Sequence, residues 1–230
     1  MQIQILDFVE GARAARGLAV VIDVFRAFSL EPYAAAAGAR LLPVAEPERA
    51  LELKRLHPDW LVAGERNARR LPGFDYGNSP HELTSRPLHG VTVVHTTHAG
   101  TQGLVAAEGA DNVITGSLVN AAAIVRYARR LAPSVVSIVR MGHKAQVRCV
   151  EDDVCAEILA ARLCGRAIDE VALLARLPDS PAAQKFLDPQ ATYAPLEDLA
   201  LCMAIDRFDF VLRLLPPDAQ GLRFIERIDV

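Results

Sequence analysis

Short apolar runs, each ending in polar residues and followed by a helical pattern, recur through the first 140 residues. The clearest is LAVVID at 18–23, and VTVVHT at 91–96 has the same character. A continuous apolar run of this length is typical of a strand buried on both faces. Strands that alternate with helices predict an α/β fold, with a largely parallel sheet and helices on both faces.

The expected elements change in character after residue 150. The expected strands cover residues 2–6, 18–23, 41–45, 60–63, 91–96, 112–115, 135–139 and 223–228. The expected helices cover residues 30–37, 47–57, 121–131, 152–163, 168–177 and 195–214, with another ending near 108. We therefore expect one unit over 1–230, which can divide into a sheet-rich lobe, 1–150, and a helix-rich lobe, 151–230.

Charge and cysteine usage exclude several classes of protein. The net charge is −3, so nothing favours a nucleic-acid partner. The cysteines, Cys149, Cys155, Cys164 and Cys202, form no CxxC pair and are expected to be reduced core residues. No signal peptide or membrane-spanning run is found, which predicts a cytoplasmic protein without a membrane partner. The composition is compatible with a homodimer. Only three of the 25 basic residues are lysine, which we interpret as coding bias.

Polar side chains gather where the expected strands end. They are Asp23, Arg26, Glu65, Arg66, Thr96, Thr97 and Arg140. Open α/β sheets bind ligands beyond the carboxyl ends of their strands. This convergence predicts an active site there. The segment 64–80, GERNARRLPGFDYGNSP, is the longest charge-dense stretch among them, and loops of this length in compact domains are commonly functional.

Each candidate also has a structural alternative. Asp23 can cap the following helix or pair with Arg26 instead of serving chemistry. Thr97 and Thr101 can be an ordinary helix cap or part of an anion-binding turn. The acids at 151–153 suit the first turn of a helix, or can join Asp23 or Glu65 around a hard cation. His95 and His98 lack metal-ligand spacing, so we expect them to be structural.

Several common phosphate-handling motifs are missing. The chain has neither GxxxxGK[ST] nor GxGxxG, and no cysteine is followed by an arginine six residues later. Phe25 stands where a haloacid-dehalogenase pattern needs a second aspartate. There is also no GxSxG elbow. The remaining picture is an oxygen-rich and arginine-rich site.

The order of these motifs resembles the 2-phosphosulfolactate phosphatase (ComB-like) family. The matching segments are Asp-Val-Phe-Arg-Ala at 23–27, Gly-Glu-Arg at 64–66, Gly-Phe-Asp-Tyr-Gly-Asn-Ser-Pro at 73–80, Thr-Thr-His-Ala-Gly-Thr at 96–101 and Glu-Asp at 151–152. The resemblance covers residues 18–165. The turn reads His98-Ala99-Gly100-Thr101 where family members commonly have Asn-Gly-Thr, so the substrate can differ from theirs.

The resemblance implies Mg²⁺-dependent hydrolysis of a phosphate monoester of a small sulfonated or carboxylated acid, in the chemistry of coenzyme M biosynthesis. Carried over to the matching positions, it implies a site that includes Asp23, Arg26, Glu65, Arg66, Asp75, Asn78, Thr97, Thr101, Glu151 and Asp152. On physical grounds we expect catalytic roles for Asp23, Arg26, Glu65 and Arg66, and metal binding by Asp23, Glu65, Glu151 and Asp152. We expect substrate binding by Asp75, Asn78, Ser79, Thr97, Gly100 and Thr101. We expect arginines to neutralise the phosphoryl oxygens. Whether an aspartate or an activated water attacks stays open. The alternative function is a non-catalytic binder of an anionic small ligand.

Overall fold

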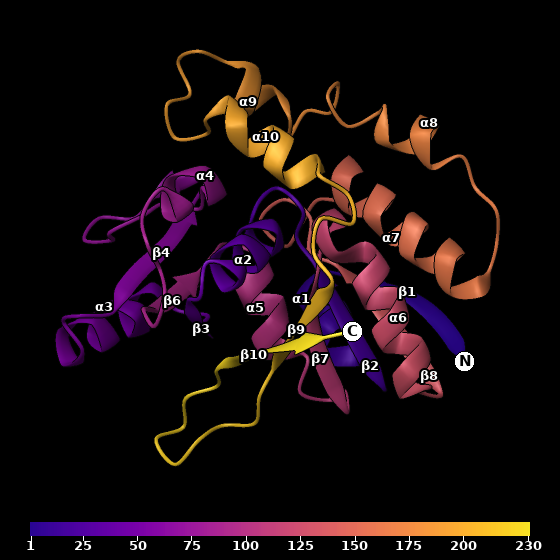
Figure 1. The fold of residues 1–230 in the computed structure, drawn as a ribbon, viewed down its shortest axis with the longest axis horizontal. Helices are drawn as coiled ribbons and strands as arrows, with labels where there is room; N and C mark the ends of the chain where they lie inside the picture. Colours follow the sequence, from indigo (N-terminus) through magenta and orange to yellow (C-terminus); the bar gives the residue numbers. More distant parts are fainter.

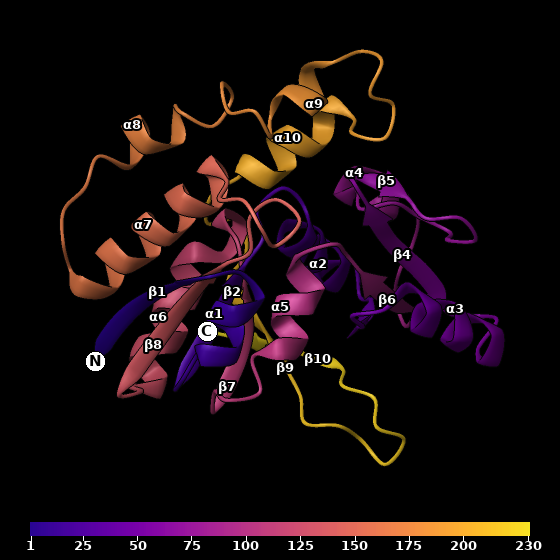
Figure 2. The same cartoon turned by 180° about the vertical axis from the view of Figure 1, so that it is seen from behind.

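The computed structural model describes residues 1–230, whose strands form two sheets (Figures 1 and 2). The first sheet has six strands, in the order β1 (Gln2–Asp7), β8 (Val135–Arg140), β2 (Leu18–Ile22), β7 (Asn112–Gly116), β9 (Phe210–Leu214) and β10 (Ile225–Asp229). Its first four strands are parallel, whereas β9 and β10 are antiparallel to their neighbours. The second sheet has the order β3 (Arg40–Pro43), β6 (Thr92–Thr96), β4 (Leu61–Arg66) and β5 (Arg69–Arg70), and is parallel apart from β5.

Helices cover both faces of each sheet. They are α1 (Phe8–Ala14), α2 (Ala27–Ala36), α3 (Pro47–Leu56), α4 (Pro80–Thr84), α5 (Gly100–Ala106), α6 (Ala121–Leu131), α7 (Val150–Cys164), α8 (Glu170–Leu174), α9 (Gln184–Leu187) and α10 (Leu196–Met203), with a 3-10 turn at Leu118–Asn120. The α/β class with helices on both faces of largely parallel sheets is confirmed. The strands divide between two sheets where the sequence suggested one.

The central strand β2 shows why the fold needs both layers. Its residues Leu18, Val20 and Ile22 pack with α6 and α7, while Ala19 and Val21 pack with α1 and α5. All five residues are fully buried. A strand with apolar side chains on both faces is stable only when both faces are covered, because each buried side chain contributes about 1.5–3 kcal/mol.

The second sheet packs in the same manner. Leu30 of α2 and Leu83 of α4 cover one face, and Leu53 of α3 covers the other. Phe210 and Leu212 of β9 pack in the same cluster as Leu30 and Leu83, so the two sheets share a continuous core. Helix α2 lies between them (Figure 1).

The C-terminal third contains both helices and strands. Helices α8, α9 and α10 lie together along one end of the molecule, while the chain after α10 returns to the six-stranded sheet as β9 and β10 (Figure 1). The expected helix over 195–214 is therefore wrong beyond Met203. The division into lobes at residue 150 stays a prediction.

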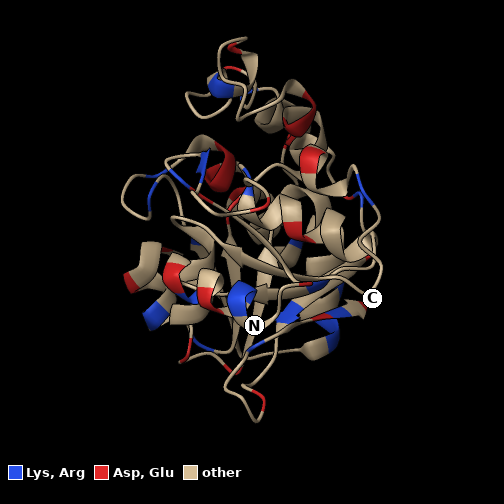
Figure 3. Ribbon diagram, turned by 90° about the vertical axis from the view of Figure 1, so that its left-hand side faces the viewer, with Lys and Arg blue, Asp and Glu red and all other residues tan.

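Residues of both charge signs occur throughout the ribbon (Figure 3). None of the helices combines the length and the apolar character that crossing a bilayer requires. All four cysteines are free thiols, but only Cys155 and Cys202 are buried. The expectation of core positions is wrong for Cys164, which is exposed.

Candidate active site

A cavity of about 610 Å³ opens at the carboxyl ends of strands from both sheets. Its wall comes from the segments after β2 and β8 in one sheet, after β4 and β6 in the other, and from the C-terminal helical region. Four acidic side chains line it, Asp23, Glu65, Glu151 and Asp152, together with four basic ones, Arg26, Lys144, Arg148 and Lys185. The strand-end argument from the sequence therefore locates a real cavity.

Asp23 stands where β2 ends, on the floor of this cavity. Its Oδ1 accepts a hydrogen bond from the Ala27 amide at 3.3 Å, and its Oδ2 accepts one from the Gly100 amide at 3.0 Å. A Cβ atom at position 100 would lie 2.8 Å from Asp23 Oδ2, so this approach needs a glycine. Asp23 thus binds the first amide of α2 and lines the cavity at the same time. Burial, and then Glu65, raise the pKa of Asp23 to about 6.

Two more acids begin helix α7, which follows the loop after β8. Both Asp152 carboxylate oxygens accept backbone hydrogen bonds, from Val24 at 2.9 Å and from Gly142 at 2.8 Å. Burial, with the charges of Asp23 and Glu151, raises the pKa of Asp152. Burial also raises the pKa of Glu151 to about 7, and Asp23 adds to this. Glu151 Oε2 is buried and has no hydrogen-bond partner, although a buried carboxylate oxygen without a partner is costly.

Glu65 is the penultimate residue of β4 and links the second sheet to the cavity. Its Oε1 accepts a hydrogen bond from the His98 amide at 2.8 Å, and its Oε2 accepts one from the Ala68 amide at 2.6 Å. The preceding Gly64 is required, because a Cβ atom there would lie 2.2 Å from the Thr96 carbonyl oxygen on β6. The Gly-Glu-Arg segment therefore allows close strand packing and presents one carboxylate.

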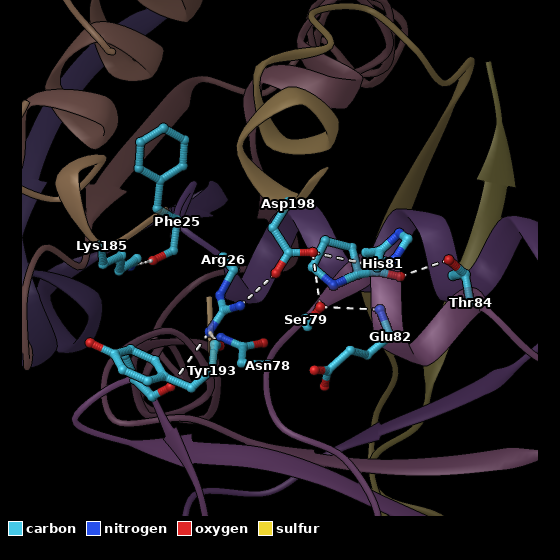
Figure 4. Close-up of polar contacts among 12 residues, drawn as sticks. Phe25, Arg26, Asn78, Ser79, His81, Glu82, Thr84, Lys185, Tyr193 and Asp198 are labelled. Atoms are coloured by element: carbon cyan, nitrogen blue, oxygen red, sulfur yellow. Dashed lines mark hydrogen bonds and ion pairs between the residues drawn. The ribbon is translucent and has the colours of Figure 1, made fainter. Parts of the chain in front are cut away.

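Arg26 forms an internal ion pair, with a partner that the sequence did not suggest. Its Nη1 donates to Asp198 Oδ2 at 2.5 Å, and its Nη2 donates to the Tyr193 carbonyl at 3.0 Å (Figure 4). Asp198 of α10 is fully buried, and its Oδ1 also accepts from Ser79 Oγ at 2.9 Å and from the His81 amide at 3.0 Å. Asp198 thus joins three segments of the chain, and it takes up much of the charge of Arg26.

The predicted site residues divide into two groups. Those that line the cavity are Asp23, Arg26, Glu65, Asn78, Glu151 and Asp152. Those that do not are Arg66, Asp75, Ser79, Thr97, Gly100 and Thr101. The roles of the second group stay predictions that this geometry does not favour.

Each residue of the second group has a structural task. Arg66 donates to the carbonyls of Glu65 and Ala45 at 2.8 and 3.1 Å. Asp75 accepts from the Val62 amide at 2.8 Å and pairs with Lys54 at 3.1 Å. Thr97 and Thr101 exchange hydrogen bonds through their hydroxyls and amides. Ser79 caps α4 by accepting from the Glu82 amide at 3.1 Å.

Asn78 reaches the cavity from a buried polar chain. Its Oδ1 lies 3.2 Å from His95 Nε2, and His95 Nδ1 lies 2.9 Å from Glu31 Oε1. His95 and Glu31 are fully buried. The structural role that we expected for His95 therefore fits this geometry.

His98 is different, because it lines the cavity. Burial lowers its pKa, and its Nδ1 is buried without a partner. Cys149 lines the cavity as well, but burial and the nearby Glu151 and Asp152 raise its pKa far above the usual range. Its thiol is therefore unsuited to act as a nucleophile.

The oxygen-rich cavity can be compared with the needs of a divalent cation. No three Asp, Glu, His or Cys side chains lie close enough to hold a metal by themselves. Mg²⁺ commonly takes one or two carboxylates and completes its shell with water and substrate phosphate. Asp23 and Glu151 fit this pattern, since the pKa of each is raised by burial beside other acids, and Glu151 keeps an unpartnered oxygen.

Comparison with known proteins decides the family. The family model described as 2-phosphosulpholactate phosphatase matches residues 4–215, nearly the whole chain. The chain belongs to the 2-phosphosulfolactate phosphatase family. The resemblance in the motifs is thereby confirmed, and the match extends well into the C-terminal region.

Three curated members of this family, each named probable 2-phosphosulfolactate phosphatase, illustrate the similarity. The protein of Symbiobacterium thermophilum is 40% identical over 64% of this chain and 64% of its own length. That of Clostridium perfringens strain SM101 is 30% identical over 85% of this chain and 82% of its own. That of Gloeobacter violaceus is 34% identical over 82% of this chain and 84% of its own length. The first of these matches thus spans less than two thirds of the relative.

Proposed function

We propose that this protein is a Mg²⁺-dependent phosphatase that hydrolyses the phosphate monoester of a small acid, with 2-phosphosulfolactate as the leading candidate. The observation that carries the proposal is the cavity itself, where Asp23, Glu65, Glu151 and Asp152 meet basic side chains at the strand ends. Family membership supports the same reaction class.

Asp23 and Glu151 would hold the metal. When bound, Mg²⁺ would neutralise negative charge on the phosphoryl oxygens and lower the pKa of a water molecule. Asp23 is already oriented by two backbone amides, so little reorganisation is needed during the reaction. Asp152 and Glu65 are held by two amides each and would maintain the shape and negative potential of the floor.

The cavity also suits a small and strongly anionic substrate. Its volume of about 610 Å³ is within the usual range for small-molecule sites. Asn78 can offer its carboxamide, while Arg148 and Lys144 line the wall formed by the loop after β8. A second acid group on the substrate, a sulfonate or a carboxylate, would find positive charge there.

The test is phosphate release from a panel of phosphorylated small acids, including 2-phosphosulfolactate, with Mg²⁺ and with EDTA. We expect turnover of at least one acid, lost on chelation and restored by Mg²⁺. Turnover that is unchanged in EDTA would contradict the metal requirement. A ligand that raises the melting temperature without any phosphate release from the panel would support a non-catalytic binder instead.

A further inference from the structure

The C-terminal region contributes a cation to the cavity that no motif identified. Lys185 lies on α9, and its side chain lines the cavity about 160 positions after Asp23 along the chain. Phe186 anchors this helix, because its ring packs edge-on against Phe25 with centroids 5.4 Å apart. The Lys185 ammonium lies 4.9 Å from the centre of the Phe186 ring.

The Lys185 ammonium has hydrogen-bond donors left for a ligand. Its Nζ donates to the Phe25 carbonyl at 3.2 Å (Figure 4), and no other hydrogen bond or ion pair involves it. An ammonium carries three donors. Two donors are therefore free on a group that is fixed by one carbonyl and one aromatic ring.

The other basic residues of the cavity are less free. Arg26 pairs with Asp198 at 2.5 Å, and Arg148 pairs with Asp153 at 2.9 Å. Only Lys144 and Lys185 line the cavity without a carboxylate within ion-pair distance, so two of the three lysines in the chain are its unpaired cations. This placement argues against coding bias as the whole explanation for where lysine occurs.

Lys185 is also the cation beside the proposed reaction centre. Its charge favours the ionised forms of both Asp23 and Glu151. A phosphate dianion that approaches these carboxylates meets strong repulsion unless positive charge lies close by. We propose that Lys185 contacts the phosphoryl group of the bound substrate and stabilises its oxygens during transfer. This inference rests on the proposed phosphatase function, and it assigns to a lysine the contact that the sequence had assigned to arginines.

The test compares Lys185→Met and Lys185→Arg with the wild type. Lys54→Met is the matched control, because Lys54 is the one lysine outside the cavity. Two readouts are used on each protein: phosphate release with Mg²⁺, and the rise in melting temperature caused by inorganic phosphate. The second readout needs no turnover, so it separates anion binding from catalysis.

We expect Lys185→Met to lower kcat by roughly 100-fold, the usual effect of losing one charged group that stabilises a transition state. It should also abolish the phosphate-induced rise in melting temperature. Lys185→Arg keeps the charge, so it should retain part of the wild-type kcat and part of the phosphate-induced rise in melting temperature. If the methionine variant does not fold, the arginine variant provides the test. Lys54→Met should match the wild type in both.

The assays separate failure of the Lys185 role from failure of the proposed phosphatase function. A folded Lys185→Met variant within threefold of wild-type kcat, with an undiminished phosphate response, would overturn the role of Lys185. If the wild type hydrolyses no phosphate ester, the proposed function fails. In that case a phosphate response that only the Lys185 variants lose would still support Lys185 as an anion contact.

Discussion

Replacing Glu151 with glutamine should stabilise the metal-free protein while damaging its function. Glu151 is 4% exposed, its Oε2 has no partner, and burial raises its pKa from 4.5 to about 7. The folded protein therefore holds this proton more tightly than the unfolded chain. Stability falls as pH rises from about 4.5 to about 7, and above that range the full cost of ionising Glu151 is present.

The size of the effect follows from the shift in the pKa of Glu151. One pKa unit corresponds to about 1.4 kcal/mol, so a change from 4.5 to about 7 corresponds to about 3 kcal/mol. Glu151→Gln removes this cost. At pH 8 without Mg²⁺ the variant should be more stable by up to about 3 kcal/mol, which is a shift of about 1 M in the urea midpoint. At pH 4 the two proteins should have equal stability.

Urea denaturation at pH 4 and pH 8, with and without Mg²⁺, measures both parts of this prediction. Mg²⁺ at 100 times its dissociation constant should stabilise the wild type by about 3 kcal/mol and leave the variant almost unchanged. Glu157→Gln, on the same helix but outside the cavity, is the control. A Glu151→Gln variant that is no more stable than the wild type at pH 8 would refute the reasoning.

Three further predictions concern residues around the cavity. Asp198→Asn should destabilise the protein by about 3–5 kcal/mol in urea denaturation, because it leaves Arg26 buried without its counter-charge. An unchanged urea midpoint would contradict this. Arg66→Lys should leave KM within about twofold of the wild type, since its guanidinium serves backbone carbonyls outside the cavity. A tenfold rise in KM would return Arg66 to the substrate site. Cys149→Ser should keep phosphate release, and the wild-type thiol should react slowly with iodoacetamide at pH 8, because its pKa is raised. Rapid alkylation would show that the thiol ionises readily.

The sequence located the cavity well, because its signal was local. Asp23 directly follows an apolar run and Glu65 follows one after a single glycine, and parallel strands place their carboxyl ends on one side. The same logic does not place Arg66 and Thr97 in the cavity lining. They lie at the correct strand ends, but their side chains turn to neighbouring carbonyls and hydroxyls. Position along a strand does not determine the direction in which a side chain points.

Tertiary pairing decided the elements that the sequence misassigned. Residues 210–214 are strand β9, although their apolar character suited a helix equally well. They pair with β7, which lies almost 100 residues earlier in the chain, and with β10, which comes after them. Helix α1 (Phe8–Ala14) was not expected either, because it is seven residues long and contains a glycine.

Long-range contacts also hid one cavity-lining residue, Lys185, and the ion-pair partner of another, Asp198. Asp198 meets Arg26 across 172 positions, and Lys185 meets the Phe25 carbonyl across 160. Neither residue lies in a motif, and both come from a region whose pattern predicted mostly helices. The one available signal was the scarcity of lysine, which gains meaning only when the cavity is known.

The most direct test of the proposed site is phosphate release by Asp23→Asn, measured beside the wild type and Asp111→Asn, an exposed aspartate outside the cavity. The substitution keeps the shape of the side chain and removes the charge at the centre of the carboxylate cluster. With Mg²⁺ and the substrate that the panel selects, Asp23→Asn should lose at least about 100-fold in kcat with its fold intact, whereas Asp111→Asn should keep full activity. A folded Asp23→Asn variant with wild-type turnover would place the chemistry elsewhere in the molecule.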